Sequence, residues 1–335
     1  IFFAGKVRGF GLYTLPEMVE KQYDSRVGLA ASFLIVIAWV GVLAAQIIAS
    51  GKILGILGVA APALWMVIFT VAFVVYAVLG GQQAIIRTDV VQIGIVLAGI
   101  FTCLALVLSR LGGWTGLVSS LPPERFAFPV SSQFGGGDLA SFLLLVGLTY
   151  LVGPDIYSRL FCARDTGTAR VSVFWTALII VPVAFAITVI GMGASALFPQ
   201  IASPEQAFPA VVTGVLPPFA GGIVLAALLG AVMSSADTIL FSASTILSVD
   251  IIGHFRPLTR EKTLFYSRWM IVILGVVALL LALVLRGVIS ALLFAYTVYT
   301  AGLIVPVIAG FYREKLKVTP RGALAAIIGG GSAAL

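Results

Sequence analysis

Long apolar runs recur along the chain, separated by short segments that hold most of the charged residues. The main runs reach about 20 residues, the length that an α-helix needs to cross the apolar layer of a bilayer. They are continuous and do not alternate with polar positions, which excludes a transmembrane β-barrel. We predict partial helices at both ends of the chain and eight membrane-spanning helices near residues 28–50, 59–80, 89–109, 138–162, 170–198, 219–248, 265–285 and 288–311.

The composition agrees with this pattern. Of the 335 residues, 61% are hydrophobic and only 10% are charged, whereas soluble domains contain about 25% charged residues. This excludes an ordinary soluble enzyme, a disordered chain and a nucleic-acid binder. One histidine and two cysteines supply neither a transition-metal cluster nor a disulfide scaffold. The fold class is therefore an all-α polytopic membrane protein whose surroundings are the lipid bilayer, and we expect no enzymatic activity and no cofactor.

The two ends of the sequence indicate a piece of a longer protein. The chain does not begin with methionine, and it starts and stops inside apolar runs. We expect residues 1–335 to form one membrane domain that is cut inside a helix at each end.

The positive charges predict the orientation. Sixteen of the 20 Lys and Arg residues lie in alternate connecting segments, and the other four lie between them. The positive-inside rule assigns the first set to the cytoplasm of a cell (inner) membrane, which also accounts for the net charge of +7. The predicted cytoplasmic segments are 1–27, 80–89, 158–170, 250–268 and 312–321. The remaining cations are Lys52, Arg110, Arg125 and Arg286.

Three acidic residues lie in or near the ends of the apolar runs: Asp89, Asp155 and Asp237. A carboxylate inside a membrane is costly and is by default a candidate functional group. Asp89 and Asp155 also fit solvated helix ends at the cytoplasmic boundary. Asp237 lies well inside its run, so it must pair with a partner, bind a cation or hold a proton.

Small and polar residues around Asp237 form a stripe on one face of a helix, because they recur at helical spacing. The stripe consists of Ala231, Ser234, Ser235, Thr238, Ser242 and Thr245. The hydroxyls have two interpretations. They can bond to the carbonyl four residues earlier or join neighbouring helices. Alternatively, they can supply oxygen ligands for a hard monovalent cation, together with a freed backbone carbonyl of Ala231.

A second feature is the pair Gly153-Pro154 inside the run 138–162. Proline removes a backbone donor and loosens the helix there. The pair is either a simple kink or a true break, and broken spans are how secondary transporters build binding sites near the middle of the membrane.

Five short stretches at the ends of the predicted spans carry a more specific signal. They are residues 13–18 (YTLPEM), 80–92 (GGQQAIIRTDVVQ), 153–159 (GPDIYSR, followed by ARD at 163–165), 204–209 (PEQAFP) and 226–237 (AALLGAVMSSAD, continuing to SVDI at 248–251). Each alone is weak, but five in order at the expected places resemble the sodium:solute symporter family, and the likeness covers nearly the whole chain.

The resemblance implies a LeuT-type helical bundle of two inverted five-helix repeats around a central site. Against that pattern the chain carries core helices 3 to 10 and part of an extra helix, so the bundle is incomplete, with about eight full spans and two partial ones. Core helix 1 and most of core helix 2 are absent. The resemblance also implies half of a sodium site from the Ala231 carbonyl and the Ser234 and Ser235 hydroxyls. It implies a second ion route from Asp89, Asp237 and Thr238.

The implied function is sodium-coupled symport of a small organic solute by alternating access, with sodium as the coupling ion. The break predicts solute contacts at Tyr150, Gly153, Pro154 and Tyr157. Sugar-transporting members have an Asn- or Asp-Gln pair at the position of Gly153-Pro154, and proline transporters have Gln-Pro. A sugar needs several fixed polar side chains, so an amino acid or monocarboxylate fits better.

Two other functions are compatible with the sequence. Some bacterial histidine kinases have a symporter-like membrane portion that acts as a sensor, and residues beyond Leu335 would distinguish this case. A proton-coupled carrier would use Asp237 as its proton site.

Overall fold

The computed structural model describes residues 3–58, 60–132, 134–201, 204–285 and 287–334, without the side chains of residues 81–86 and Glu205. Arg286, one of the cations counted above, lies outside this description. The longer helices in the described ranges are α3 (Ser25–Gly55), α4 (Pro62–Leu111), α6 (Gly136–Val152), α8 (Thr166–Leu197), α10 (Pro218–Thr245), α12 (Arg260–Val284), α13 (Val288–Gly310) and α15 (Pro320–Ala333). A π-helical segment (Ile246–Ile252) continues α10.

Shorter helices connect or flank the long ones. They are α1 (Ala4–Gly9), α2 (Leu15–Gln22), α5 (Gly113–Ser120), α7 (Pro154–Phe161), α9 (Ala207–Gly214), α11 (Gly253–Phe255) and α14 (Arg313–Leu316), with 3-10 turns at Pro123–Phe126 and Pro204–Gln206. Within the described ranges, eight helices are long and apolar enough to cross a membrane. The predicted number and order of spans are therefore confirmed.

Local chemistry explains several of the helix starts. The carboxylate of Asp24 accepts a hydrogen bond of 3.0 Å from the Val27 amide at the start of α3. Asp165 accepts one of 2.7 Å from the Thr168 amide at the start of α8. These N-cap bonds satisfy backbone donors that have no partner inside the helix, and the same bond at Asp165 lowers the pKa of its exposed carboxyl.

Helix α4 contains two predicted spans joined without a non-helical loop. Its spans run over Pro62–Gly80 and Arg87–Leu111. The hydroxyls of Tyr76 and Thr88 lie 2.8 Å apart although twelve positions separate them. Twelve residues of straight helix rise about 18 Å, so this contact requires the helix axis to turn back between the two spans. The segment 80–89, predicted to connect two spans, is thus a bend inside one helix.

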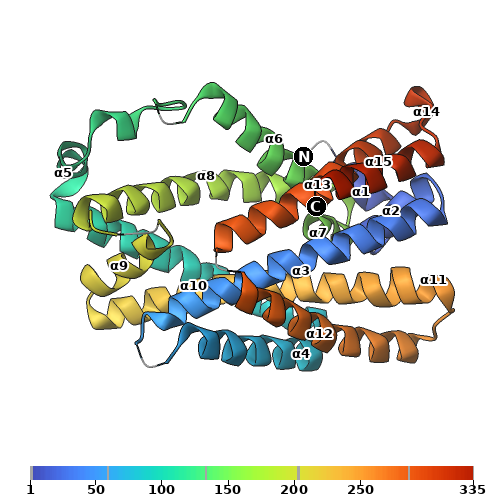
Figure 1. Ribbon diagram of the computed structural model, residues 1–335, viewed down its shortest axis with the longest axis horizontal. Helices are drawn as coiled ribbons and strands as arrows, with labels where there is room; N and C mark the ends of the chain where they lie inside the picture. Colours follow the sequence, from blue (N-terminus) through green and yellow to red (C-terminus); the bar gives the residue numbers. More distant parts are fainter. Residues whose placement is uncertain (1–2, 59, 133, 202–203, 286, 335) are drawn as a thin grey trace.

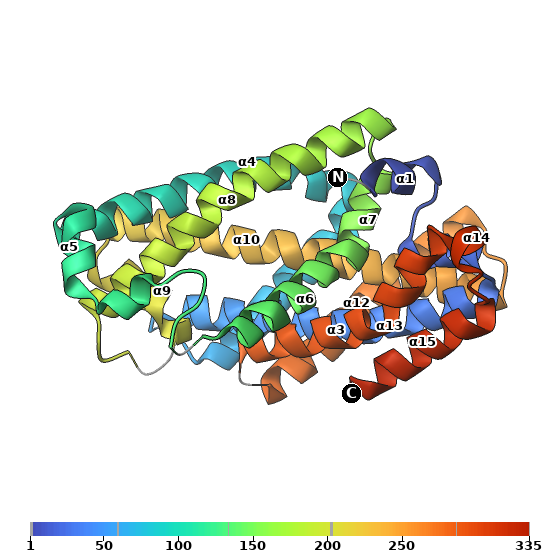
Figure 2. The ribbon, with the colours of Figure 1, turned by 90° about the horizontal axis from the view of Figure 1, so that it is seen from above.

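Helix α10 runs through the middle of the bundle and contacts α3, α4 and α12 (Figure 2). Small residues permit this close packing. For example, a Cβ added at Gly99 of α4 would lie 3.0 Å from the Cβ of Ala227 on α10. The first half of α4 packs into a core with α3, α12 and α13, whereas its second half packs with α8 and α9. This arrangement brings the start of the second half of α4 beside the polar stripe of α10.

The connecting segments gather at two opposite ends of the bundle. Helices α5 and α9 lie at one end, and α11 and α14 lie at the other (Figure 1). This agrees with the predicted alternation of the segments between the two sides of a membrane. The outer surface exposes apolar side chains such as Val181 and Phe185 of α8, which is typical of a face in contact with lipid.

Candidate functional site

The predicted break in the span 138–162 is present at Gly153. Helix α6 ends at Val152, Gly153 has extended backbone angles (φ −64°, ψ 114°), and α7 begins at Pro154. Proline suits the first position of a helix because its missing N–H has no helical partner there. The Tyr157 hydroxyl donates a hydrogen bond of 2.9 Å to the Leu151 carbonyl. This bond joins α7 back to α6 and satisfies a carbonyl that the break has freed.

A cavity of about 260 Å³ lies beside the break. Residues of α3, α6, α7, α10 and α13 line it, so it lies where the broken helix faces the centre of the bundle. Its polar and aromatic lining consists of Trp39, Gln46, Thr149, Tyr150, Asp155, Arg159, Ser235, Thr238, Tyr296 and Tyr299. Aromatic faces with a few convergent polar groups are typical of a site for a small organic molecule.

Two residues of the predicted ion route, Asp89 and Thr238, join Ser234 of the predicted sodium half site and Arg159 in one group next to this cavity. The Ser234 hydroxyl donates to Asp89 Oδ1 at 2.5 Å. Arg159 Nη2 lies 3.5 Å from Asp89 Oδ2 and donates to the Thr238 hydroxyl at 3.1 Å. Thr238 in turn donates to the Ser234 carbonyl at 2.9 Å. Four side chains from α4, α7 and α10 thus form one hydrogen-bonded and ion-paired group.

Asp237 stands apart from this group. Its side chain is 1% exposed, and within the described part of the chain its Oδ1 atom has no hydrogen-bond partner. A buried, unpaired carboxylate oxygen is costly. Asp237 therefore fits a site that a proton or a cation completes, as the sequence alone indicated.

The other predicted residues divide into two groups. Tyr150, Gly153, Ser235 and Thr238 line the cavity. Ala231, Pro154 and Tyr157 are absent from its lining. Ala231 is half-buried on α10, and Pro154 and Tyr157 are buried. For Tyr157 the reason is geometric, because its hydroxyl is directed to the Leu151 carbonyl.

Thr245, at the far end of the polar stripe, makes a hydrogen bond within its own helix. The Thr245 hydroxyl donates to the Phe241 carbonyl of its own helix at 2.9 Å. This is the back-bonding expected of a hydroxyl in an apolar helix. The Ser234 hydroxyl instead contacts a carboxylate on another helix. Thr245 thus makes a bond within its own helix, whereas Ser234 joins α10 to α4 through an acidic group.

Sequence reasoning missed Arg159 as a site residue because its charge was attributed to a cytoplasmic loop. Its position six residues after a helix break was the available signal. Asp155, which the sequence left open between a functional carboxylate and a solvated helix end, lines the cavity as well. The aromatic residues Trp39, Tyr296 and Tyr299 are spread over α3 and α13, and no spacing in the sequence marks them.

Two of the five motif stretches meet at the end of the bundle that holds α11. The Thr14 hydroxyl donates to Asp250 Oδ1 at 3.1 Å while also accepting from the Glu17 amide at the start of α2. Asp250 belongs to the π-helical end of α10. This contact ties the start of α2 to the end of α10.

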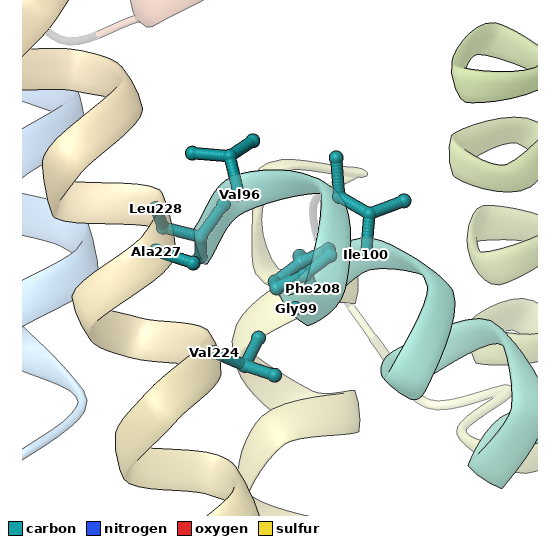
Figure 3. Close-up of a pocket in the computed structure, with 7 residues that line it drawn as sticks. All are labelled: Val96, Gly99, Ile100, Phe208, Val224, Ala227 and Leu228. Atoms are coloured by element: carbon teal, nitrogen blue, oxygen red, sulfur yellow. The ribbon is translucent and has the colours of Figure 1, made fainter. Parts of the chain in front are cut away.

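A second cavity is far smaller, about 10 Å³, and lies between α4, α9 and α10 (Figure 3). Its lining is apolar and consists of Val96, Gly99, Ile100, Phe208, Val224, Ala227 and Leu228. That volume is about one water molecule, so this cavity is too small for an organic solute.

The spans, the broken helix and the cavity beside it define a polytopic membrane protein with a cavity at the centre of its helices. A search of solved structures supports this class. The fold is similar to that of a Na⁺-coupled sialic acid symporter in a substrate-bound outward-open state, with a TM-score of 0.73 and 16% identity over 98% of this chain and 78% of that one. The fold is therefore the LeuT-type helical bundle.

The profile of the sodium:solute symporter family matches residues 1–330, and the chain belongs to this family. It is 26% identical to the sodium/pantothenate symporter of Escherichia coli K12 over 98% of this chain and 70% of that protein. It is 25% identical to the sodium/glucose cotransporter of Vibrio parahaemolyticus over 95% of this chain and 65% of that protein. It is 25% identical to the sodium/pantothenate symporter of Haemophilus influenzae over 80% of this chain and 57% of that protein. The chain thus spans about 57–70% of these three relatives.

Proposed function

We propose that residues 1–335 form one membrane domain of a sodium-coupled symporter that moves a small organic solute by alternating access. The observation that carries this proposal is the contact between Ser234 and Asp89, 2.5 Å long, beside a cavity at a helix break. The contact brings together a hydroxyl and a carboxylate, the kinds of oxygen that a hard cation binds. Family membership supports the same function.

The donor set fits sodium. The Ser234 and Ser235 hydroxyls and the Ala231 carbonyl are the oxygens of the proposed sodium half site, and Asp89, Asp237 and Thr238 supply those of the proposed second ion route. Oxygens of these kinds are the ligands that a hard cation takes. Sodium that moves inward along a membrane potential supplies about 2.3 kcal/mol per charge for each 100 mV. Because Ser235 and Thr238 also line the cavity, a bound ion would lie next to the solute.

The cavity favours an amino acid over a simple monocarboxylate. Asp155 supplies a negative charge, and Trp39, Tyr150 and Tyr296 supply aromatic faces. A carboxylate beside aromatic rings recognises an ammonium group. An anion without an amine could pair with Arg159 in the same lining but would offer Asp155 no partner, whereas an amino acid offers an ammonium group to Asp155 and a carboxylate to Arg159. We therefore propose a solute that carries an amine together with its carboxylate.

Uptake by the full-length protein in reconstituted vesicles tests the function. Solute uptake should collapse when external sodium is replaced by choline at constant pH and potential. Equal uptake in choline and sodium would remove the sodium hypothesis. An α-amino acid should inhibit uptake, whereas the acid of the same carbon skeleton without the amine should not. Inhibition by both compounds alike would contradict the role of Asp155.

The burial of Asp237 favours proton coupling as the second candidate. A carboxylate with a buried, unpartnered oxygen can hold a proton as well as a cation. In that case a pH gradient, and not sodium, would drive accumulation.

We also propose that the segments 80–89, 158–170, 250–268 and 312–321 face the cytoplasm. The excess of positive charge in these segments supports this orientation.

A further inference from the structure

Arg159 approaches the ion route from the inner half of the broken helix. One nitrogen, Nη2, lies 3.5 Å from Asp89 Oδ2 and donates to the Thr238 hydroxyl at 3.1 Å. The other carboxylate oxygen of Asp89 accepts from Ser234. The guanidinium thus lies at Oδ2, the carboxylate oxygen of Asp89 that Ser234 does not contact.

A cation that uses Asp89 as a ligand must compete with this guanidinium. Both are positive, and both need the same carboxylate oxygen and the same Thr238 hydroxyl. The competition is open because the Arg159 side chain is 62% exposed and a single nitrogen makes the contacts. The pair joins a 62% exposed guanidinium to a 23% exposed carboxylate over 3.5 Å. Ion pairs that water reaches contribute little free energy, so we expect sodium to compete with the arginine.

The sequence offers the displaced side chain a second partner. Asp155 precedes Arg159 by four positions in α7, the spacing at which an acid and a base lie next to each other on a helix. Both residues line the cavity. A guanidinium that leaves Asp89 therefore remains inside the site, because α7 holds it there.

We propose that Arg159 is a tethered cation that occupies the Asp89 end of the ion route and that sodium must displace toward Asp155. This inference rests on the proposed function, because it assigns a competitor to the proposed sodium site. It makes Arg159 a positioning residue that sets the sodium concentration at which the route fills.

Equilibrium binding of radioactive sodium to the purified full-length protein tests the proposal without requiring a known solute. Arg159→Gln should lower the half-saturating sodium concentration roughly threefold to fivefold, the range expected when a weak exposed pair is lost. The matched control is Arg164→Gln, which removes the same charge from an exposed residue whose Nε atom lies 4.0 Å from the carboxylate of its neighbour Asp165. It should bind sodium like the wild type. Choline chloride at high, constant concentration screens remote charges during the measurement.

A cysteine at position 159 allows a positive charge to be added chemically after the protein has folded. This controls for an effect of the substitution on folding. Arg159→Cys, made together with Cys162→Ser, should bind sodium more tightly than its parent. Modification with 2-aminoethyl methanethiosulfonate, which attaches an ammonium group, should weaken binding again. Modification with methyl methanethiosulfonate, which attaches a neutral group, should leave sodium binding unchanged. Equal effects of the two reagents, or a half-saturating concentration that is unchanged or raised in Arg159→Gln, would overturn the proposal.

The same measurement separates this inference from the proposed function. If the wild type and Arg159→Gln both bind no sodium, both ideas fail. If the wild type binds none and Arg159→Gln binds it, the tethered cation is supported and sodium coupling of the wild type is contradicted. If the wild type binds sodium and Arg159→Gln binds it no better, only the role of Arg159 fails.

Discussion

The Ser234 hydroxyl and the Asp89 carboxylate lie 2.5 Å apart although 145 positions separate them in the sequence. A hydrogen bond to an ionised carboxylate is short and stronger than one between neutral groups. It links α10 to the start of the second span of α4, and it lies one residue from Ser235 in the wall of the cavity. The proposed ion site and the cavity are therefore neighbours that share α10.

Ser234→Ala tests the ion route. The change deletes one oxygen with little volume, so the fold should persist. Loss of one ligand to a charged group costs about 1.5–3 kcal/mol, which corresponds to a rise of roughly tenfold to a hundredfold in the half-saturating sodium concentration for uptake. Ser242→Ala, two turns further along the same face, is the control and should leave that concentration unchanged. Equal effects of the two variants would indicate helix packing alone.

Linkage gives the same variant a second expected result. If sodium and solute are coupled, Ser234→Ala must also weaken solute binding at fixed, subsaturating sodium, and high sodium should restore it. Solute binding measured over a sodium series checks this. Weakening that persists at saturating sodium would point to a distorted cavity.

Gly153→Leu tests the break. Even a Cβ at this position would lie 2.8 Å from Asp155 Oδ1 and 3.3 Å from the Thr149 carbonyl oxygen, so a longer side chain must enter the cavity. Uptake should be abolished while the protein remains monodisperse. Gly147→Leu is the matched control on α6, where an added Cβ meets nothing within 4 Å. Uptake by Gly153→Leu with unchanged apparent affinity would show that the break is only a kink.

Tyr157→Phe tests the brace across the break. It removes the 2.9 Å bond to the Leu151 carbonyl and leaves that acceptor without its side-chain partner. The free energy of unfolding should fall by about 1 kcal/mol, a decrease of roughly 2 °C in the melting temperature. Thermal unfolding in detergent measures it. Tyr13→Phe, at a residue that is 80% exposed, should leave the melting temperature unchanged.

Asp237→Asn separates the two coupling ions. If a proton at Asp237 drives transport, the change should abolish accumulation driven by a pH gradient, and sodium should have no effect on the wild type. If sodium drives transport, wild-type accumulation should follow the sodium gradient at constant pH. Asp237→Asn should then raise the half-saturating sodium concentration. Uptake of labelled solute under the two imposed gradients decides between them.

Cysteine labelling tests the orientation. With Cys162→Ser as background, we expect Ser132→Cys to react with an impermeant thiol reagent on intact cells and Pro257→Cys to react only after the membrane is opened. Both positions are exposed and lie in segments predicted on opposite sides. Labelling of Pro257→Cys alone on intact cells would reverse the orientation.

The sequence by itself determined the fold class, the eight spans and the place of the irregularity at Gly153-Pro154, because hydrophobic length and the lack of a proline N–H act locally. It also determined that Ser234, Ser235 and Thr238 share one helix face, since helical spacing follows from sequence alone. The five motif stretches indicated the sodium:solute symporter family. These features need no knowledge of how the helices pack.

Only the tertiary structure decided which polar groups meet. Asp89 and Ser234 come together because α4 turns back on itself and packs against α10. Arg159 lies between Asp89 and Thr238 because the break directs α7 toward them, and the same break turns the Tyr157 hydroxyl away from the cavity and onto α6. Such contacts depend on the packing of distant helices, and no periodicity along the chain encodes which side chains they bring within hydrogen-bond distance.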